Sequence, residues 1–290
     1  MRYKLRHRTT YHYGGPVTRS DHRMWLHPRI TRTQSVESFE LETSPATGVL
    51  KAETDYFGNP THLMSIEEPH EELWVEARSR VEVMAAPDPI GFDSLAAVQD
   101  AMARRDTAEA AEAAEYCFPT FYSTANDAIE EYARDVFLPD RSLIEAARDL
   151  TTRIFTEFDY DPAATDAATS GIESFSAKKG VCQDFAHVFL ACCRTVGVPA
   201  RYVSGYLLTR PPEGQEKLIG SDASHAWVSV WAPNAGWVDF DPTNDVIPRD
   251  EHITTAWGRD FADVSPIRGI VLGGGAGHGI DVAVDVIPEG

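Results

Sequence analysis

The 290-residue sequence has few cysteines and no apolar run long enough to cross a bilayer. Its four cysteines are too few and too unevenly spaced to resemble the disulfide framework of a small secreted domain. The basic start, MRYKLRHRTTYHY, is not followed by the apolar stretch of a secretory signal peptide. From these absences we expect a cytoplasmic protein that is not associated with membranes.

Positive charge is also scarce, because 26 basic residues stand against 45 acidic ones and the formal net charge is −19. A strongly acidic protein repels phosphate groups, so we do not expect nucleic acid or anionic membrane as a partner. No C-x-x-C pair occurs in the sequence. A zinc set of Cys182, His187 and Cys192 fails because steps of five residues turn side chains away from one helix face. We therefore expect no metal and no cofactor.

The first part of the chain has the alternating pattern of β-strands. Apolar and polar residues alternate from Tyr3 to Tyr13 and again over residues 73–84, and a turn is expected at residues 14–16. We predict an N-terminal antiparallel β-sandwich domain over residues 1–85.

The remainder of the chain divides at a segment rich in alanine and glutamate. Residues 86–125 contain two early prolines and then this segment, which predicts a linker with one helical stretch. Helical periodicity begins at Asn126 and continues from Ser142 to Phe158. We expect residues 126–290 to form a catalytic core that includes the C-terminal strands.

The segment KGVCQDFAHVFLACCRTVGVPAR, residues 179–201, predicts a helix with Cys182 in its first turn. Apolar residues follow at helical spacing, and Gly197 and Pro199 end the helix. A thiol at this end lies at the positive pole of the helix dipole, which favours the nucleophilic thiolate. A buried and inert cysteine is the alternative interpretation of Cys182 taken alone.

The segment SHAWVSVWAPNAGWVDFDPTND, residues 224–245, predicts two strands joined by a tight turn. His225 lies on the first strand, and Asp239 and Asp241 share one face of the second, so a carboxylate can lie beside the imidazole. Asp241 is followed by Pro242, which ends the strand ladder near the expected helix start. A cysteine, a histidine and an aspartate in this order suggest a nucleophile, a base and an orienting group.

Three blocks resemble the core of the transglutaminase-like superfamily of papain-like cysteine enzymes: GVCQDFAHVFLACCRTVGVPARYVSGYL, SHAWVSVW and GWVDFDPTN. The opening YKLRHRTTYHYGGPVTRSDHRMWLHPR and the closing DVSPIRGIVLGGG are similar to the bacterial branch with its own N-terminal β-domain. The resemblance implies an α+β fold in which a cysteine-bearing helix packs on an antiparallel sheet. It also implies that Cys182, His225 and Asp241 form the triad, through the G-x-C, H-A-W and D-P-T motifs.

The function implied by these blocks is acyl transfer at a thiol. We expect a cysteine protease or amidase that attacks an amide of a protein or peptide-like substrate and forms a thioester intermediate. Hydrolysis is favoured because the sequence shows neither an amine-acceptor pocket nor a calcium loop of the D-x-D-x-D-G type. A protein-glutamine amine transferase and a catalytically silent binding module are the two alternatives.

Several further residues are expected to support this chemistry. The backbone N–H of Cys182 is the natural first oxyanion donor, and Tyr160 and Gln183 are candidates for the second. Asp184, in the first helical turn, is expected to cap the helix or to bond to a loop. The polar loop of residues 209–223 leads directly to the catalytic histidine. It either shapes substrate access or is an ordinary hairpin connection.

Overall fold

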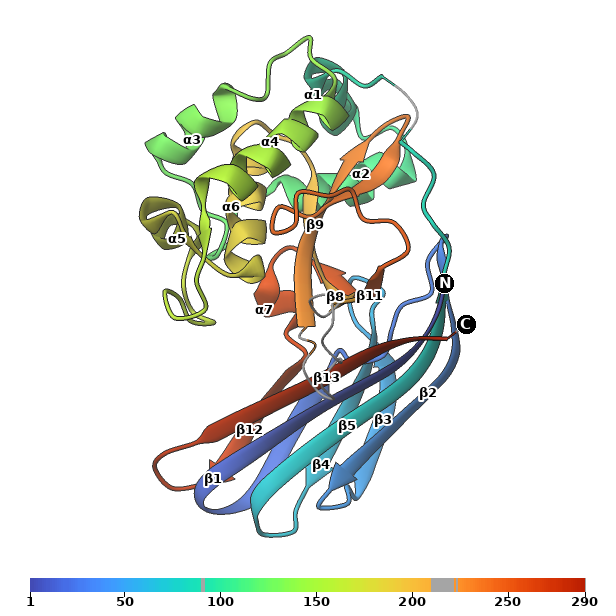
Figure 1. Cartoon of the computed structure of the whole chain (residues 1–290), viewed down its shortest axis with the longest axis vertical. Coiled ribbons are helices and arrows are strands. Elements are labelled where there is room, and N and C mark those ends of the chain that lie inside the picture. The colour runs from blue at the N-terminus through green and yellow to red at the C-terminus, as the bar shows by residue number, and fades with distance from the viewer. Residues whose placement is uncertain (90–91, 210–221, 223, 290) are drawn as a thin grey trace, which may run out of the picture.

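The computed structural model describes residues 1–89, 92–209, 222 and 224–289 and has the expected α+β fold (Figure 1). A seven-stranded antiparallel sheet forms the N-terminal region, and a smaller sheet covered by helices forms the core. The large sheet has the order β2-β5-β1-β4-β3, and β12 and β13 also pair with β1. Its strands are β1 (Arg2–Met24), β2 (Gln34–Ser44), β3 (Val49–Thr54), β4 (Pro60–Ile66), β5 (His70–Val83), β12 (Ile267–Gly273) and β13 (Gly279–Glu289).

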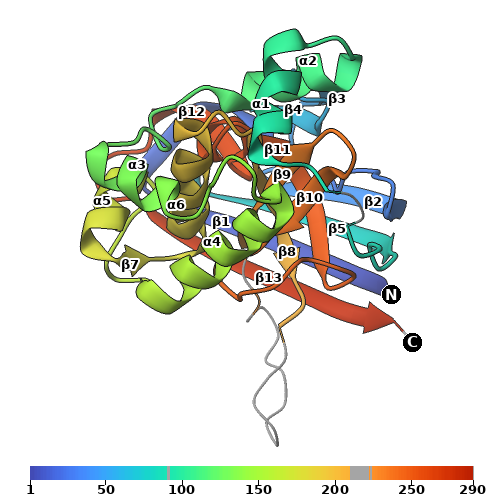
Figure 2. The ribbon, with the colours of Figure 1, turned by 90° about the horizontal axis from the view of Figure 1, so that it is seen from above.

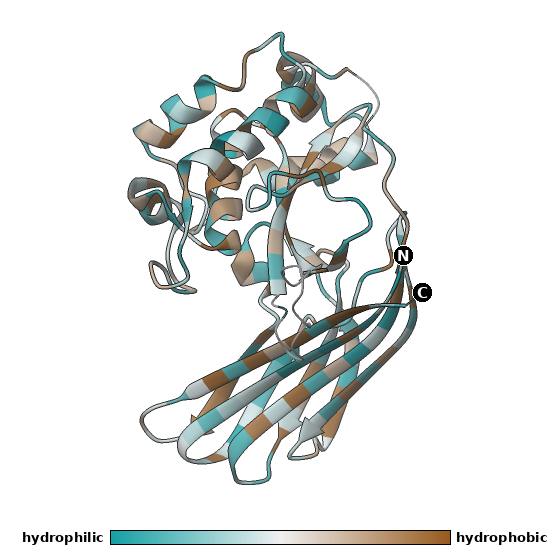
Figure 3. Ribbon diagram, in the orientation of Figure 1, coloured by the Kyte–Doolittle hydropathy of each residue, from teal (hydrophilic) through white to brown (hydrophobic). Residues whose placement is uncertain are grey.

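Strand β1 organises the large sheet and continues through residues 14–16, where a turn was expected. Its pairing with β5 shifts register between His12 and Val17, which marks an irregularity that lets the strand bend. Hydropathy alternates along the strands, so one face of each is apolar (Figure 3). Where a sandwich was expected, the strands form one bent sheet. A buried hydrophobic cluster packs the end of β1 and the residues after it against β4 and β5: Met24, Leu26, Met64, Ile66, Leu73, Val75 and Ala77.

The C-terminal strands belong to the N-terminal sheet. We expected them within the core of residues 126–290, but β12 and β13 both pair with β1. Val284 and Val286 of β13 are buried against Tyr3 and Leu5 of β1, which gives their apolar faces a partner. The glycine-rich turn of residues 273–277, in which several glycines have positive φ, connects the two strands.

The core contains all the helices of the described ranges and a four-stranded antiparallel sheet of order β10-β9-β8-β11. The strands of this sheet are β8 (Ala200–Leu207), β9 (Ser224–Ala232), β10 (Gly236–Phe240) and β11 (His252–Gly258). Two short strands of the core, β6 (Asp159–Tyr160) and β7 (Lys179–Gly180), pair with each other. The helices of the core are α1 (Leu95–Arg104), α2 (Ala108–Ala114), η1 (Glu115–Cys117), α3 (Asp127–Arg134), α4 (Leu143–Glu157), α5 (Gly171–Ala177), α6 (Cys182–Thr195) and α7 (Phe261–Val264).

The expected linker is more structured than its composition suggested. Helices α1 and α2 and the short η1 occupy half of it, and the alanines of α1 and α2 pack around Trp231 of the core sheet. Small side chains allow this close approach of helix to ring. The segment therefore contributes to the core.

Helix α6 is the centre of the core. It packs on β8 and β9 and is surrounded by α3, α4 and α5 (Figure 2). The predicted helix is confirmed, with Cys182 as its first residue and Gly197 just beyond its end in a left-handed conformation, φ +70°. Beside its start, the short parallel pair of β6 and β7 places Tyr160 opposite Gly180.

The two parts of the molecule share a hydrophobic cluster. Tyr3 and Leu5 of the large sheet pack with Tyr206 of β8 and Ile253 of β11. None of the helices in the described ranges is long and apolar enough to cross a membrane. The large sheet is thus docked directly on the core sheet that carries His225.

Candidate active site

Cys182 lies at the N-terminal end of α6 and is partly exposed. The first bond of the helix runs from the backbone N–H of Phe185 to the carbonyl oxygen of Val181, at 3.1 Å. The N–H of Cys182 precedes this bond, so it is one of the donors that a helix start leaves outside its own ladder. A nucleophile and an oxyanion donor can therefore come from one residue.

His225 and Asp241 meet at the end of the core sheet. The imidazole Nε2 lies 2.8 Å from Oδ2 of Asp241. The other carboxylate oxygen, Oδ1, accepts hydrogen bonds from the backbone N–H groups of Thr243, at 2.9 Å, and Asn244, at 3.2 Å. Asp241 is fully buried, and these bonds hold its carboxylate in one orientation.

The side chain of Cys182 also acts on His225 and helps to raise its pKa. Because Asp241 occupies Nε2, the nitrogen that remains for the thiol is Nδ1. Burial lowers the pKa of His225, but the interactions with Asp241 and Cys182 outweigh burial and raise it to about 10. A protonated imidazole beside the sulfur stabilises a thiolate. The structure brings the three predicted triad residues together, while their catalytic role stays a prediction.

Asp239, the rival to Asp241, has another partner. Its Oδ2 accepts a hydrogen bond from Nε1 of Trp227 at 3.0 Å. Asp239 stands opposite Ser229 in the β9–β10 ladder, further into the sheet than His225. The carboxylate bonded to His225 is therefore that of Asp241.

The sequence analysis missed two residues that contact this carboxylate. Nε2 of His252, the first residue of β11, lies 2.9 Å from Oδ2 of Asp241, and Nδ2 of Asn244 donates to the same oxygen at 2.7 Å. No motif marks His252, which only begins an alternating run. Asn244 was within the quoted DPTN block and could have been considered.

His225, Asp241 and His252 also form a set of potential metal ligands, with their ligand atoms within 4.8 Å of one another. Both imidazole Nε2 atoms, however, point at the same oxygen, at 2.8 and 2.9 Å. These distances are those of hydrogen bonds to a carboxylate. We interpret the set as a hydrogen-bonded network around Asp241.

The two candidates for the second oxyanion donor differ in their surroundings. Nε2 of Gln183 donates to the carbonyl oxygen of Ala167 at 3.3 Å, so its amide is directed at the loop that precedes α5. Tyr160 is 57% exposed and its ring meets the edge of Phe185. Burial and the nearby Cys182 raise the pKa of Tyr160, which keeps its hydroxyl protonated as a donor.

Asp184 makes both of the contacts expected of it. Its Oδ2 accepts hydrogen bonds from the backbone N–H of Val181, at 2.8 Å, and from the hydroxyl of Thr165, at 2.7 Å. Burial raises the pKa of its carboxyl despite these two bonds. A Cβ atom at Gly180 would lie 2.5 Å from Asp184 Oδ2, so this glycine makes room for the cap.

We predict that Asp184→Ala lowers the free energy of unfolding by about 1–3 kcal/mol, because two partly buried donors lose their acceptor. Alkylation of Cys182 should not slow, since a negative charge near the thiol is removed. Urea unfolding and iodoacetamide labelling measure the two effects. Asp184→Asn, which keeps an acceptor oxygen, is the matched control. A large loss of labelling with an intact fold would contradict this structural role.

The pKa of His225 also predicts how stability depends on pH. It rises from 6.5 to about 10 on folding, so the contribution of His225 is fully present below pH 6.5 and is lost as the pH rises through about 10. We expect the free-energy difference between wild type and His225→Gln to shrink over this window. Urea unfolding at several pH values tests this, and a difference that stays constant would contradict it.

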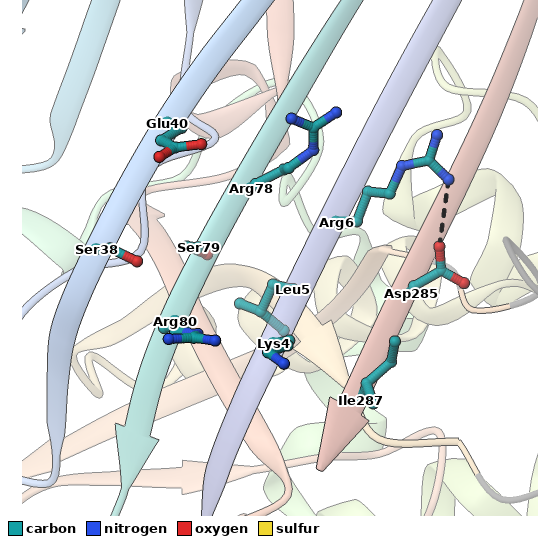
Figure 4. Close-up of a pocket in the computed structure, with 10 residues that line it drawn as sticks. All are labelled: Lys4, Leu5, Arg6, Ser38, Glu40, Arg78, Ser79, Arg80, Asp285 and Ile287. Atoms are coloured by element: carbon teal, nitrogen blue, oxygen red, sulfur yellow. Dashed lines mark ion pairs between the residues drawn. The ribbon is translucent and has the colours of Figure 1, made fainter. Parts of the chain in front are cut away.

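A cavity of about 420 Å³ lies on the large sheet and contains none of the triad residues (Figure 4). Arg6 points toward Asp285, at 3.7 Å, and toward the buried Glu76, at 2.8 Å. Lys4 pairs with Glu289 at 2.8 Å. Acidic side chains thus pair with both Lys4 and Arg6.

The loop of residues 209–223 lies outside the described residues except for Thr209 and Asp222, so its expected influence on substrate access stays a prediction. All four cysteines are free thiols. Cys192 and Cys193 are fully buried in α6, and burial raises the pKa of both. Cys182 is therefore better placed for reaction than either of them.

Comparison with known proteins shows the family of this chain. Residues 3–82 match the model of the bacterial transglutaminase-like N-terminal region, and residues 130–242 match that of the transglutaminase-like superfamily. The uncharacterized protein Rv2569c of Mycobacterium tuberculosis is 40% identical over 292 residues, which cover 99% of this chain and 93% of that protein. The chain belongs to the transglutaminase-like superfamily.

Two more distant members are informative. The crystal structure named "Putative Cysteine Protease" from Cytophaga hutchinsonii has a TM-score of 0.77 and covers 100% of this chain and 92% of its own, at 20% identity. It shares the fold of this transglutaminase-like chain. The protein-glutamine gamma-glutamyltransferase of Pseudomonas aeruginosa is 37% identical over 90 residues, 30% of this chain and 13% of that enzyme.

Proposed function

We propose that this protein is a cysteine hydrolase that cleaves an amide of a protein or peptide-like substrate through a thioester on Cys182. The observation that supports this is that His225 is bonded to Asp241, at 2.8 Å, and also interacts with the side chain of Cys182, which helps to raise its pKa. It places a nucleophile, a proton carrier and a buried anion in the order that acyl transfer needs.

In the first half-reaction, the sulfur of Cys182 attacks the carbonyl carbon and negative charge moves to the carbonyl oxygen. The N–H of Cys182 donates to that oxygen at the start of α6, and Tyr160 is the candidate for a second donor. The C–N bond then breaks, His225 gives its Nδ1 proton to the leaving amine, and a thioester remains. Asp241 stays ionised and holds Nε2–H, so Nδ1 is again free to accept a proton.

In the second half-reaction, water attacks the thioester while His225 accepts its proton at Nδ1. The carboxylic acid leaves, the C–S bond breaks, and the proton returns to the pair of His225 and Cys182. Every proton in this scheme passes through Nδ1, because Nε2 is committed to Asp241 throughout.

p-Nitrophenyl acetate tests the proposal without knowledge of the natural substrate. We expect release of p-nitrophenolate and an acetyl group on Cys182, seen by peptide mass spectrometry, followed by slow release of acetate. Cys182→Ser is the control for labelling elsewhere. A catalytically silent binding module predicts no acetyl-Cys182, and that result would refute the proposal.

Transfer to an amine is the second candidate, favoured by the similarity to the Pseudomonas aeruginosa enzyme over 90 residues. The two functions differ only in what attacks the thioester. A primary amine such as cadaverine, added to the p-nitrophenyl acetate reaction, separates them. Acetate as the main product supports hydrolysis, and N-acetylcadaverine as the main product supports transfer.

A further inference from the structure

His252 contacts the same carboxylate oxygen of Asp241 as His225 does, and the two imidazole ring centroids lie 5.8 Å apart. Asp241 has a pKa held below its usual range, because the bonds from His225 and His252 outweigh its burial. It is therefore a carboxylate, which only accepts hydrogen bonds, so both imidazoles must carry hydrogen on Nε2. The His252 bond fixes the position of the oxygen that His225 uses.

The strand that carries His252 is held by the N-terminal region. β11 is an edge strand of the core sheet, and an edge leaves backbone groups without ladder partners. Two residues before His252, the carbonyl oxygen of Asp250 accepts from the hydroxyl of Tyr3 at 2.8 Å. Two residues after it, Gln34 bonds both backbone groups of Thr254, accepting at 2.9 Å and donating at 2.8 Å.

A second amide repeats this arrangement further along β11. Asn59 accepts from the backbone N–H of Trp257 at 2.9 Å and donates to its carbonyl oxygen at 2.8 Å. Between the anchors, Ile253 points the other way from His252 and packs with Leu5 and Val286 of the large sheet. Successive side chains of β11 thus reach the large sheet and the triad in turn.

We propose that His252 is a positioning residue for the triad, and that the N-terminal sheet sets its place by holding the edge of β11. This inference rests on the proposed function for its catalytic consequence. The N-terminal region would then be part of the active-site framework. Its effect passes from Gln34 through β11 and His252 to Asp241, and from there to His225.

The effect on His225 has two components of opposite sign. If His252 positions the carboxylate, its removal lets Asp241 turn away from His225, and the pKa of His225 falls. If His252 only competes with His225 for Oδ2 of Asp241, its removal strengthens the bond between His225 and Asp241, and the pKa of His225 rises. Cys182, Asp241 and His252 are the titratable groups whose contacts with the His225 side chain the structure gives.

NMR titration of the His225 ring in a Cys182→Ala background measures this directly, because the thiol no longer contributes. We expect His252→Leu to lower the pKa of His225 by about one unit, a tenfold change in the protonation equilibrium. His252→Gln places an amide donor near the former Nε2 and should restore most of the pKa. This rescue separates positioning from a general loss of packing.

Gln34→Met tests the contribution of the N-terminal sheet, since it keeps the length of the side chain and removes both amide contacts to Thr254, together with the bond to the carbonyl oxygen of Arg29 at 2.7 Å. We expect a shift in the same direction of about half a unit, roughly threefold in the equilibrium. Combined with His252→Leu it should add nothing, because the two act along one route. Gln99→Met, which removes a bond to Val196 on the core surface, is the matched control and should leave the pKa unchanged.

A pKa of His225 that stays constant or rises in His252→Leu would overturn the inference. Additive shifts of Gln34→Met and His252→Leu would overturn the link through β11. The titration does not depend on catalysis, so it stands apart from the acetyl-Cys182 test. A silent Cys182 with a responsive His225 refutes only the proposed function, and the reverse pattern refutes only the inference.

Discussion

Cys182→Ala should abolish the turnover of p-nitrophenyl acetate while leaving the thermal midpoint of unfolding almost unchanged. The thiol is partly exposed at the start of α6 and helps to raise the pKa of His225, so we expect the chemistry to depend on it while the fold does not. Iodoacetamide at mildly acidic pH should label Cys182 in the wild type, because an imidazolium partner keeps the thiolate populated.

Cys193→Ala should have the opposite effects, with lower stability and unchanged turnover. Cys193 is fully buried in the core of α6, so the substitution leaves a small cavity and should lower stability by about 1 kcal/mol. Turnover per folded molecule should be retained. Comparable turnover in Cys182→Ala, measured with the p-nitrophenolate assay, would remove Cys182 as the nucleophile.

Asp241→Asn should keep the fold and lower kcat/KM by about 10³- to 10⁴-fold. Asparagine can present its NH₂ group to His225, which forces Nε2 to accept and puts the ring hydrogen on Nδ1, facing the thiol. The imidazole then cannot take the proton of Cys182, and its positive charge loses the buried anion. The same amide would also meet the Nε2–H of His252, at present 2.9 Å from the carboxylate.

Asp239→Asn is the matched control, since it is the same change on the same strand. An asparagine oxygen can still accept from Trp227, which now donates to Asp239 at 3.0 Å, so most activity should be retained. Steady-state kinetics on p-nitrophenyl acetate compares the two variants. A larger loss at position 239 would overturn the assignment of Asp241 as the orienting residue.

The elements that bear the candidate triad follow from local patterns in the sequence. Helical spacing after Cys182, with Gly197 and Pro199 beyond the helix, defines α6, and the alternation around the Pro-Asn-Ala-Gly turn defines the hairpin of β9 and β10. The position of Cys182 at a helix start and the nearness of His225 to Asp241 both follow from these elements. Such features depend on neighbours a few residues away, which a single sequence displays.

Only the tertiary structure decided which distant segments meet. C-terminal strands were expected from the sequence, but their pairing with β1 depends on residues near the other end of the chain. His252 carries no motif, and its bond to Asp241 exists because β11 lies beside β8. Gln34 and Thr254 are 220 residues apart. The side-chain amide of Gln34 bonds the edge of β11 where a neighbouring strand would otherwise pair, and a single side chain leaves no periodic pattern in the sequence. Local propensity determined the elements of this protein, whereas burial and the pairing of backbone groups determined their arrangement.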